Sequence, residues 1–467
     1  MSIESINPAT EEVMARYDEF TPQQIDHALS EVRQAFTTWR RTSLDERSAP
    51  MRRAAQYLRA NKERFARLIT QEMGKPIVES EAEIEKCAWN CDFYADNART
   101  FLADEPVRTN ARESFVAFEP LGVILAIMPW NFPFWQVFRF AAPALMAGNT
   151  SVLKHASNVP GCALAIEEVF RESGFPRGAF RTLLVSSSVI DSVIEDDRIA
   201  AATLTGSDVT GSKVAATAGR AIKKMVMELG GSDPFIVLAD ADLDGAIEFA
   251  VKSRYQNSGQ SCIAAKRFIV QEDVADDFTR RFTAAVAGLR VGDPLQRDTQ
   301  VGPLARGDLR DGVHGQVRES VEQGARVLVG GEPLSGRGYF YAPTVLADVR
   351  PEMTVFRQEV FGPVAPLIRV RDAEEAVATA NDSVYGLGGN LWTRDTERGK
   401  DLARRIESGN VFINGMTASD PRLPFGGVKR SGFGRELSSF GIREFTNIQT
   451  IWIGPAQGPA QSTTPAE

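Results

Sequence analysis

The sequence predicts an α/β protein with two doubly wound parallel sheets, and three observations lead to this fold class. Short runs rich in β-branched residues alternate with helical stretches from Thr150 to Gly231, and a second series of the same kind follows. At 467 residues the chain is long enough for two or three domains with a large buried core. Hydrophobic residues make up 43% and charged residues 24%, which is typical of a globular protein.

The first hundred residues are predicted to be mostly helical. Thr21 and Pro22 are typical of a helix start, with the threonine as the capping residue and the proline in the first turn. Apolar residues then recur at helical spacing as far as Trp39. More amphipathic helix is expected to about Leu102, and Gly74-Lys75-Pro76 indicates a break within it.

The next segment combines strands with an apolar helix. The pattern predicts two strands within residues 114–127, separated by Glu119-Pro120 as in a hairpin. The apolar stretch 121–148 is interrupted by three prolines and contains Asn131 and Arg139, which argues against a membrane span. We expect a buried strand, a sharp turn and then a helix.

The two α/β series contain recognisable strands. In the first series they are expected at residues 151–154, 181–185, 202–205 and 224–227, and in the second at 234–238, 267–270 and 410–414. We interpret the second series as a domain that presents Cys262 towards the first. The residues from Gly454 onwards are of low complexity and are predicted to be disordered.

Composition also limits the partners and the compartment. The net charge of −8 argues against nucleic acid, because phosphate-binding proteins usually carry a basic excess. Four cysteines are too few for a disulfide scaffold, and the N-terminus shows no leader, so we expect a soluble cytoplasmic protein with no membrane partner. Cys87 and Cys91 lie one helical turn apart but have no further ligand nearby, so no metal is predicted.

Cys262 and Glu228 are the main candidates for catalysis. Cys262 lies among glycine and small polar residues, which favours an accessible thiol, and Glu228 ends an apolar run before two glycines. A thiolate nucleophile and a carboxylate that activates water are what covalent catalysis at a carbonyl requires. No histidine flanks Cys262, so a Cys-His hydrolase is not indicated. Taken singly, each residue also fits a structural role, as a buried cysteine or a capping carboxylate.

Four motifs together resemble the aldehyde dehydrogenase superfamily in order and spacing. They are Met128-Pro129-Trp130-Asn131-Phe132-Pro133, Glu228-Leu229-Gly230-Gly231, Gly259-Gln260-Ser261-Cys262 and Glu359-Val360-Phe361-Gly362-Pro363. The similarity runs from about Asn7 to about Thr446, so it covers nearly the whole chain. Within the superfamily, the sequence is most similar to the short bacterial-type succinate-semialdehyde dehydrogenases that prefer NADP.

The resemblance implies an aldehyde dehydrogenase-like fold of two parallel-sheet domains and a small β element for oligomerisation. Residues 1–102 and 121–230 would form the cofactor-binding domain, and residues 231–433 the catalytic domain with the thiol. Residues 103–120 and 434–453 would form the oligomerisation element, and 454–467 a disordered tail. A homodimer or a homotetramer is expected.

A turn between a strand and a helix is the candidate pyrophosphate site. The usual G-x-G-x-x-G signature is absent, but residues 205–211 (Thr-Gly-Ser-Asp-Val-Thr-Gly) supply a glycine-containing turn where backbone amides can approach an anion. The motif alone suits an ordinary turn better. The resemblance assigns Gly206, Ser207 and Gly211 to the cofactor.

The choice of nicotinamide cofactor depends on Lys154 and Ser157. In relatives that prefer NAD, the position of Ser157 is commonly a glutamate, whose carboxylate would repel a ribose 2′-phosphate. Serine and the nearby ammonium of Lys154 therefore favour NADP, with NAD used at lower efficiency. The alternative is a strand end followed by a polar turn. The resemblance adds Trp130, Glu359 and Phe361 to the cofactor-binding residues, the last two at the nicotinamide ribose and ring.

The resemblance also implies a reaction sequence. Cys262 would attack the aldehyde carbon, and the side-chain amide of Asn131 and the backbone N–H of Cys262 would stabilise the oxyanion. After hydride transfer, Glu228 would activate the water that hydrolyses the thioester. A relative that transfers the acyl group to coenzyme A would not need Glu228, and a non-enzymatic binding protein would form no NADPH.

Arg139 is the main indicator of the substrate. A buried guanidinium needs an anion from the protein or from a ligand, and Trp135 shares its helix face. The resemblance places this helix along the substrate tunnel, where Arg139 would clamp the distal carboxylate of an ω-semialdehyde and Ser419 would assist; the alternative is an arginine paired with a structural acid. Succinate semialdehyde is the expected substrate, and glutarate semialdehyde, one methylene longer, is the nearest alternative.

Overall fold

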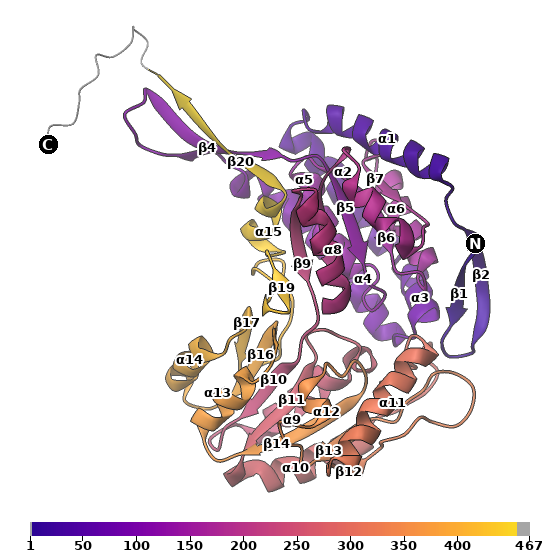
Figure 1. Ribbon diagram of the computed structural model, residues 1–467, viewed down its shortest axis with the longest axis vertical. Helices are drawn as coiled ribbons and strands as arrows, with labels where there is room; N and C mark the ends of the chain where they lie inside the picture. Colours follow the sequence, from indigo (N-terminus) through magenta and orange to yellow (C-terminus); the bar gives the residue numbers. More distant parts are fainter. Residues whose placement is uncertain (1, 455–467) are drawn as a thin grey trace, which may run out of the picture.

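Two predominantly parallel sheets organise the protein, whose computed structural model describes residues 2–454 (Figure 1). The first sheet has six strands in the order β19-β9-β8-β5-β6-β7. The second has seven strands in the order β12-β13-β14-β11-β10-β16-β17. Helices flank both sheets, so the predicted fold class, with two doubly wound sheets, is confirmed. The tail predicted at 454–467 lies, apart from Gly454, outside the described residues.

The six-stranded sheet is parallel except at one edge. Its parallel strands are β5 (Val123–Met128), β6 (Thr150–His155), β7 (Phe180–Thr182), β8 (Ile199–Thr205) and β9 (Lys224–Glu228), and β19 (Gly432–Phe433) pairs antiparallel with β9. The strand predicted at 181–185 is wrong at its C-terminal end. Leu183 and Val185 are apolar because they enter the core, and not because they continue the sheet.

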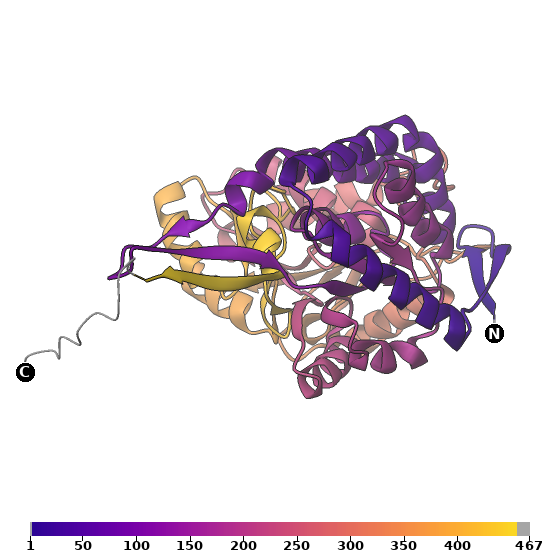
Figure 2. The same cartoon turned by 90° about the horizontal axis from the view of Figure 1, so that it is seen from above.

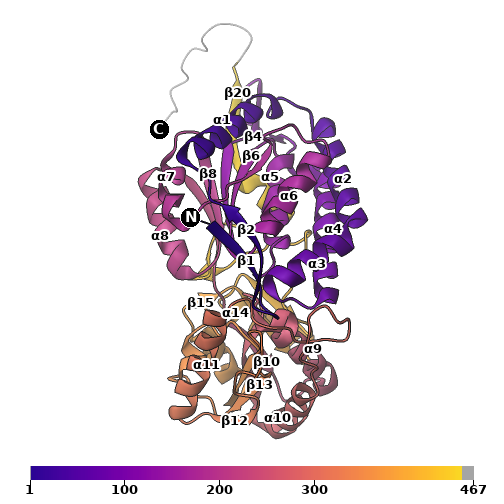
Figure 3. The ribbon, with the colours of Figure 1, turned by 90° about the vertical axis from the view of Figure 1, so that its right-hand side faces the viewer.

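Helices cover both faces of this sheet (Figure 3). On one face lie α2 (Leu44–Ala60), α3 (Lys62–Met73), α4 (Ile77–Phe101), α5 (Trp135–Met146) and α6 (Pro160–Glu172). On the other lie α1 (Pro22–Trp39), α7 (Ile190–Glu195) and α8 (Asp208–Arg220). Alternate residues of β5 enter the two apolar clusters, as expected for a central strand buried on both sides.

The second sheet is built in the same way. Its parallel strands are β10 (Asp233–Val237), β11 (Ala265–Gln271), β13 (Thr344–Ala347), β14 (Val364–Val370), β16 (Gly388–Trp392) and β17 (Asn410–Ile413), and β12 (Arg326–Val329) is antiparallel at the edge. One face is covered by α9 (Leu243–Tyr255) and α10 (Glu272–Ala287). The other is covered by α11 (Gly307–Glu322), α12 (Thr354–Arg357), α13 (Ala373–Asn381) and α14 (Thr396–Arg405).

The helix start and the helix break predicted in the N-terminal region are confirmed. Thr21 caps α1 through a capping box with Gln24, and Pro22 is the first residue of the helix. Gly74 follows α3 with a φ of +83°, a left-handed conformation that favours glycine and ends the helix. The residues before α1 form a hairpin of β1 (Ser2–Asn7) and β2 (Glu12–Asp18).

A three-stranded sheet projects from the body of the protein (Figure 2). It contains β3 (Glu105–Pro106), β4 (Glu113–Pro120) and β20 (Thr446–Ile453), and α15 (Ser438–Glu444) precedes β20. The hairpin expected within residues 114–127 is wrong. β5 already has β6 and β8 on its two sides, so β4 pairs with β20 instead, from the far end of the chain.

The remaining elements are short. They are the paired strands β15 (Tyr385–Gly386) and β18 (Val428–Lys429) and the 3₁₀ helices η1 (Ser187–Val189) and η2 (Gln256–Gly259). Among the helices that the structure describes, none combines the length and the apolar character that crossing a bilayer demands.

Candidate active site

Cys262 follows a backbone segment of unusual conformation between α9 and β11. Asn257, Ser258 and Gly259 have φ values of +53°, +55° and +75°. Residues other than glycine rarely adopt this left-handed backbone conformation. The side-chain amide of Asn257 donates to the carbonyls of Asn131 (2.8 Å) and Gln260 (3.0 Å). The hydroxyl of Ser258 donates to the carbonyl of Gly302 at 3.0 Å. These contacts offset the strain and determine the direction of the loop.

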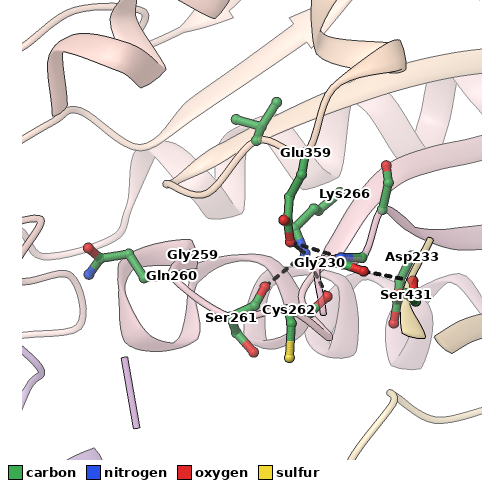
Figure 4. A network of polar contacts seen from close by, with 12 residues as sticks. Gly230, Asp233, Gly259, Gln260, Ser261, Cys262, Lys266, Glu359 and Ser431 are labelled. Carbon is green, nitrogen blue, oxygen red and sulfur yellow. Dashed lines mark hydrogen bonds and ion pairs between the residues drawn. The ribbon is translucent and has the colours of Figure 1, made fainter. Parts of the chain in front are cut away.

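Lys266 on β11 holds the other side of the loop. Its Nζ donates to the carbonyls of Ser261 (2.8 Å) and Cys262 (2.7 Å) and lies 3.2 Å from Oε1 of Glu359. Figure 4 shows that the sulfur of Cys262 points away from these contacts. The backbone of Cys262 is therefore fixed, while its sulfur takes no part in these contacts.

Burial favours the protonated form of the Cys262 thiol. Burial raises its pKa to about 12, although the positive charges of Arg139 and Lys266 lower the pKa in part. A thiolate is the reactive form, so attack on a carbonyl requires a base or a change in the surroundings of the sulfur.

Asn131 lies beside the cysteine loop, and His155 supports the turn that carries it. Nδ2 of Asn131 donates to the carbonyl of Gln260 at 3.1 Å. Nδ1 of His155 accepts from the backbone N–H of Ala156 at 2.9 Å, so Nε2 carries the proton and donates to the carbonyl of Pro133 at 2.9 Å. Burial lowers the pKa of His155 to about 4, and the ring stays neutral. The sequence did not indicate this role of His155.

Glu228 is buried at the end of β9. Its side chain has no hydrogen-bond partner in the described part of the chain, and burial raises its pKa well above the usual range, while Arg139 lowers the pKa in part. A Cβ added at Gly426 would lie 2.8 Å from Oε1 of Glu228, so only glycine leaves room for this carboxyl. Glu228 does not line the cavity at Cys262, and its role as a base stays a prediction that requires movement of its side chain or access of water to it.

A cavity of about 150 Å³ opens onto Cys262. The three residues predicted to bind substrate line it together with the cysteine, although they come from distant parts of the chain; they are Trp135, Arg139 and Ser419. Helix α4 contributes lining residues that the sequence did not single out, namely Glu79, Ala82, Glu83 and Lys86. Positions 79 and 82, 79 and 83, 82 and 86, and 83 and 86 lie three or four residues apart, so the four side chains share one helix face.

Arg139 is ion-paired inside the protein. Its guanidinium contacts the carboxylate of Glu436, and the two residues are 2% and 4% exposed. The guanidinium also lies 4.7 Å from the centre of the Phe425 ring. Of the two partners that the sequence left open for Arg139, a ligand or a protein acid, the structure supplies the protein acid. Contact of Arg139 with substrate stays a prediction.

Glu83 joins α4 to the start of α5. One of its oxygens accepts from the backbone N–H groups of Phe134 (2.9 Å) and Trp135 (3.0 Å), and the other contacts the ammonium of Lys75. This carboxylate therefore stabilises the N-terminus of the helix that carries Trp135 and Arg139. The sequence offered no sign of this contact, because it depends on how two helices pack.

Lys154 and Ser157 line a separate and larger cavity of about 660 Å³. Lys154 is half-buried at the end of β6, and within residues 2–454 no acid lies within ion-pair distance of it. Burial lowers the pKa of its ammonium. Both side-chain amide atoms of Asn158 are buried without a partner in the same region of the structure. The cavity thus combines a free cation with unsatisfied polar atoms, as an anionic and polar ligand requires.

The predicted turn between a strand and a helix is confirmed. β8 ends at Thr205 and α8 begins at Asp208, with Gly206 and Ser207 between them. The hydroxyl of Ser207 caps α8 by accepting from the backbone N–H of Thr210 at 3.2 Å. A Cβ at Gly211 would lie 2.6 Å from the side chain of Leu229, so this glycine allows close packing of α8. Contact of Gly211 with a cofactor stays a prediction.

The segment that follows β5 and the segment that precedes β14 meet at Glu359 and Phe361. The rings of Phe361 and Trp130 contact each other edge to face, with centres 5.8 Å apart. Oε1 of Glu359 accepts from the backbone N–H of Gly231 at 3.0 Å and pairs with Lys266. The structure thus brings three of the predicted cofactor-binding residues to the junction near the cysteine loop.

The motifs and their geometry agree with a comparison against known families. The aldehyde dehydrogenase family model matches residues 1–451. This chain belongs to the aldehyde dehydrogenase family. It is 53% identical over 453 residues to a "Probable succinate-semialdehyde dehydrogenase" of Synechocystis sp. that is named with NADP(+), covering 97% of this chain and 100% of the relative. It is 51% identical over 448 residues to the succinate semialdehyde dehydrogenase Sad of Escherichia coli, named with NAD(P)+, covering 96% and 97%.

A solved structure of the family has the same fold. The succinic semialdehyde dehydrogenase of Streptococcus pyogenes, determined in complex with NADP+, superposes with a TM-score of 0.95 at 38% identity. The match covers 97% of this chain and 100% of that chain. The fold of this aldehyde dehydrogenase family member is therefore conserved over almost its full length.

Proposed function

We propose that this protein oxidises succinate semialdehyde to succinate with NADP. The observation that carries the proposal is a small cavity that contains the Cys262 thiol together with the cations Arg139 and Lys86. Cavities of about 150 Å³ accept molecules the size of benzene, which is comparable to a four-carbon semialdehyde. The names of the relatives from Synechocystis sp. and Escherichia coli support the same substrate.

The proposed chemistry begins at Cys262. Its thiolate attacks the aldehyde carbon, and the resulting C–S bond leaves an oxyanion that the Asn131 amide and the Cys262 backbone N–H stabilise. NADP, when bound, supplies the acceptor for the hydride that leaves this carbon, which converts the adduct to a thioester. Glu228 then takes a proton from water, and the attack of this water breaks the C–S bond, releasing succinate and the cysteine sulfur.

The residues at the larger cavity fit NADP better than NAD. Lys154 offers a cation without an acidic partner among the described residues, and Ser157 is exposed beside it, so a 2′-phosphate would meet attraction and a hydrogen-bond donor. We propose that Gly206, Ser207 and Gly211 approach the pyrophosphate at the N-terminus of α8, and that Trp130, Glu359 and Phe361 contact the nicotinamide half. NAD is expected at lower efficiency.

We also propose that the projecting sheet assembles the protein as a homodimer or homotetramer in the cytoplasm. Ile448 and Trp452 on β20 are 65% and 52% exposed and lie on the same face of the strand, and exposed apolar residues favour contact with another copy. The division into cofactor-binding (1–102, 121–230), catalytic (231–433) and oligomerisation (103–120, 434–453) parts belongs to this proposal.

Absorbance of NADPH during incubation with a panel of aldehydes and both cofactors tests the function. We expect the highest kcat/KM with succinate semialdehyde and NADP, and no turnover for Cys262→Ala with nearly unchanged cofactor binding. Equal rates on butanal would indicate a broad-specificity enzyme, and a higher rate on glutarate semialdehyde would move the assignment by one methylene. Formation of product only with added coenzyme A would indicate an acylating dehydrogenase.

A further inference from the structure

Lys266 on β11 lies behind the peptide group that joins Ser261 to Cys262. Its side chain is 1% exposed and does not line the cavity at the thiol, whereas Ser261 and Cys262 both do. Nζ of Lys266 donates to the carbonyl of Ser261 at 2.8 Å and to that of Cys262 at 2.7 Å. In Figure 4 the sulfur of Cys262 points away from both contacts. The ammonium is therefore placed to act on the backbone of Cys262 and not on a substrate.

The contacts of Lys266 require its charged form. Oε1 of Glu359 lies 3.2 Å from Nζ, so three acceptors surround the nitrogen. An ammonium has three N–H donors for them, and a neutral amine has only two. Burial lowers the pKa of Lys266, and the carboxylates of Glu359 and Asp233 oppose this effect. The carbonyl of Ser261 thus accepts a charge-assisted hydrogen bond inside the protein.

The Ser261 carbonyl and the backbone N–H of Cys262 belong to the same peptide group. Resonance makes this group planar and couples its two ends, so a cation at the oxygen withdraws electrons from the nitrogen and strengthens the N–H as a donor. The trans geometry also points the N–H away from Lys266. Among residues 2–454 no acceptor binds the N–H of Cys262, which leaves it available to a ligand.

We propose that Lys266 is a positioning residue that polarises and orients the N–H of Cys262 as an oxyanion donor. When the thiolate attacks an aldehyde, the carbonyl oxygen gains a negative charge beside this N–H. A polarised donor stabilises that charge more than it stabilises the neutral carbonyl, so it accelerates the attack. The inference rests on the proposed function for the identity of the nucleophile, and it adds to the oxyanion site a cation that never contacts the substrate.

Three variants separate the charge of Lys266 from its role in holding the loop. Lys266→Met removes both the charge and the hydrogen bonds, Lys266→Gln retains a neutral donor, and Lys266→Arg retains the charge. We expect kcat/KM for succinate semialdehyde to fall about 100-fold in Lys266→Met and about tenfold or more in Lys266→Gln, with most of it recovered in Lys266→Arg. The Kd for NADP should change by less than about threefold, because Glu359 keeps its bond from the N–H of Gly231.

Alkylation of Cys262 by iodoacetamide, followed by peptide mass spectrometry, distinguishes polarisation from displacement of the thiol. The sulfur attacks the carbon that bears iodine and iodide leaves, so this reaction forms no oxyanion. Burial raises the pKa of Cys262, and Lys266 is one of two cations that lower it in part, so the rate should fall by less than about fivefold in Lys266→Met. Equal losses in alkylation and in kcat/KM would overturn the proposal.

Stability and a surface control complete the test. Lys400→Met on the exposed face of α14 removes the same charge and should leave both rates unchanged. Lys266→Met leaves Glu359 and two carbonyls without the ammonium, so its melting temperature should fall. If that variant does not fold, the other two decide, and equal kcat/KM of Lys266→Gln and Lys266→Arg would refute a role of the charge.

The wild-type protein separates this inference from the proposed function. If wild type forms no NADPH from any aldehyde, or if Cys262→Ala remains active, the proposed function fails and the role of Lys266 fails with it. If wild type is active through Cys262 and Lys266→Gln retains the full kcat/KM, only the role of Lys266 fails.

Discussion

Replacing Arg139 with methionine tests what the buried guanidinium does. In the structure it pairs with Glu436, packs against the Phe425 ring and is 2% exposed. Methionine preserves much of the packing but leaves the carboxyl of Glu436 buried without a cation. Breaking a buried pair in this way costs about 3–5 kcal/mol. For a cooperative unit of about 150–250 residues, this loss lowers the melting temperature by roughly 6–20 °C.

The loss of stability is expected to grow with pH. Burial raises the pKa of Glu436 in the folded protein, and Arg139 opposes this rise. Without Arg139 the folded-state pKa rises further above the unfolded value. A carboxyl of this kind favours folding at low pH, and that contribution is lost as the pH rises through the folded pKa. Thermal unfolding should therefore show a larger difference between variant and wild type at mildly alkaline than at mildly acidic pH.

A double variant provides the control. In Arg139→Met/Glu436→Gln neither side chain carries a charge, so most of the lost stability should return, because the uncompensated carboxylate is gone. If the single variant is already as stable as wild type, the ion pair contributes nothing and our interpretation of Arg139 is wrong.

The same variant separates a role in chemistry from a role as substrate clamp. Arg139 lowers the pKa of both Cys262 and Glu228, so its loss raises both pKa values and slows thiolate formation for any aldehyde. We expect kcat/KM to fall by a similar factor for succinate semialdehyde and for butanal. A selective loss on succinate semialdehyde with unchanged stability would restore Arg139 as the residue that clamps the carboxylate.

Two further outcomes are expected. Glu228→Gln should form the thioester and then stall, so rapid mixing should give a burst of NADPH before slow turnover; loss of the burst would place Glu228 before hydride transfer. Ser157→Glu should shift the ratio of kcat/KM for the two cofactors towards NAD, because a carboxylate repels the 2′-phosphate, and an unchanged ratio would contradict the roles of Lys154 and Ser157.

The sequence by itself determined the family, the fold class and the local elements. Hydrophobic periodicity and capping residues act over a few positions, so the helix start at Thr21 and the turn at Gly206-Ser207 could be predicted. The family motifs are short and contiguous, which made Cys262, Glu228 and Asn131 recognisable together. The strand pairing of β4 could not be predicted in this way, because its partner β20 lies more than three hundred residues away.

Only the tertiary structure decided the electrostatics of the site. Arg139 could be recognised as buried from its apolar surroundings, but its partner Glu436 comes from the C-terminal segment that the sequence analysis assigned to oligomerisation. Lys86 looks like an ordinary charged residue of an amphipathic helix, and nothing in its neighbours along the chain indicates Ser419 or Cys262. The charge that a side chain presents to a ligand depends on which other charges fold against it, and that is a property of packing between distant segments.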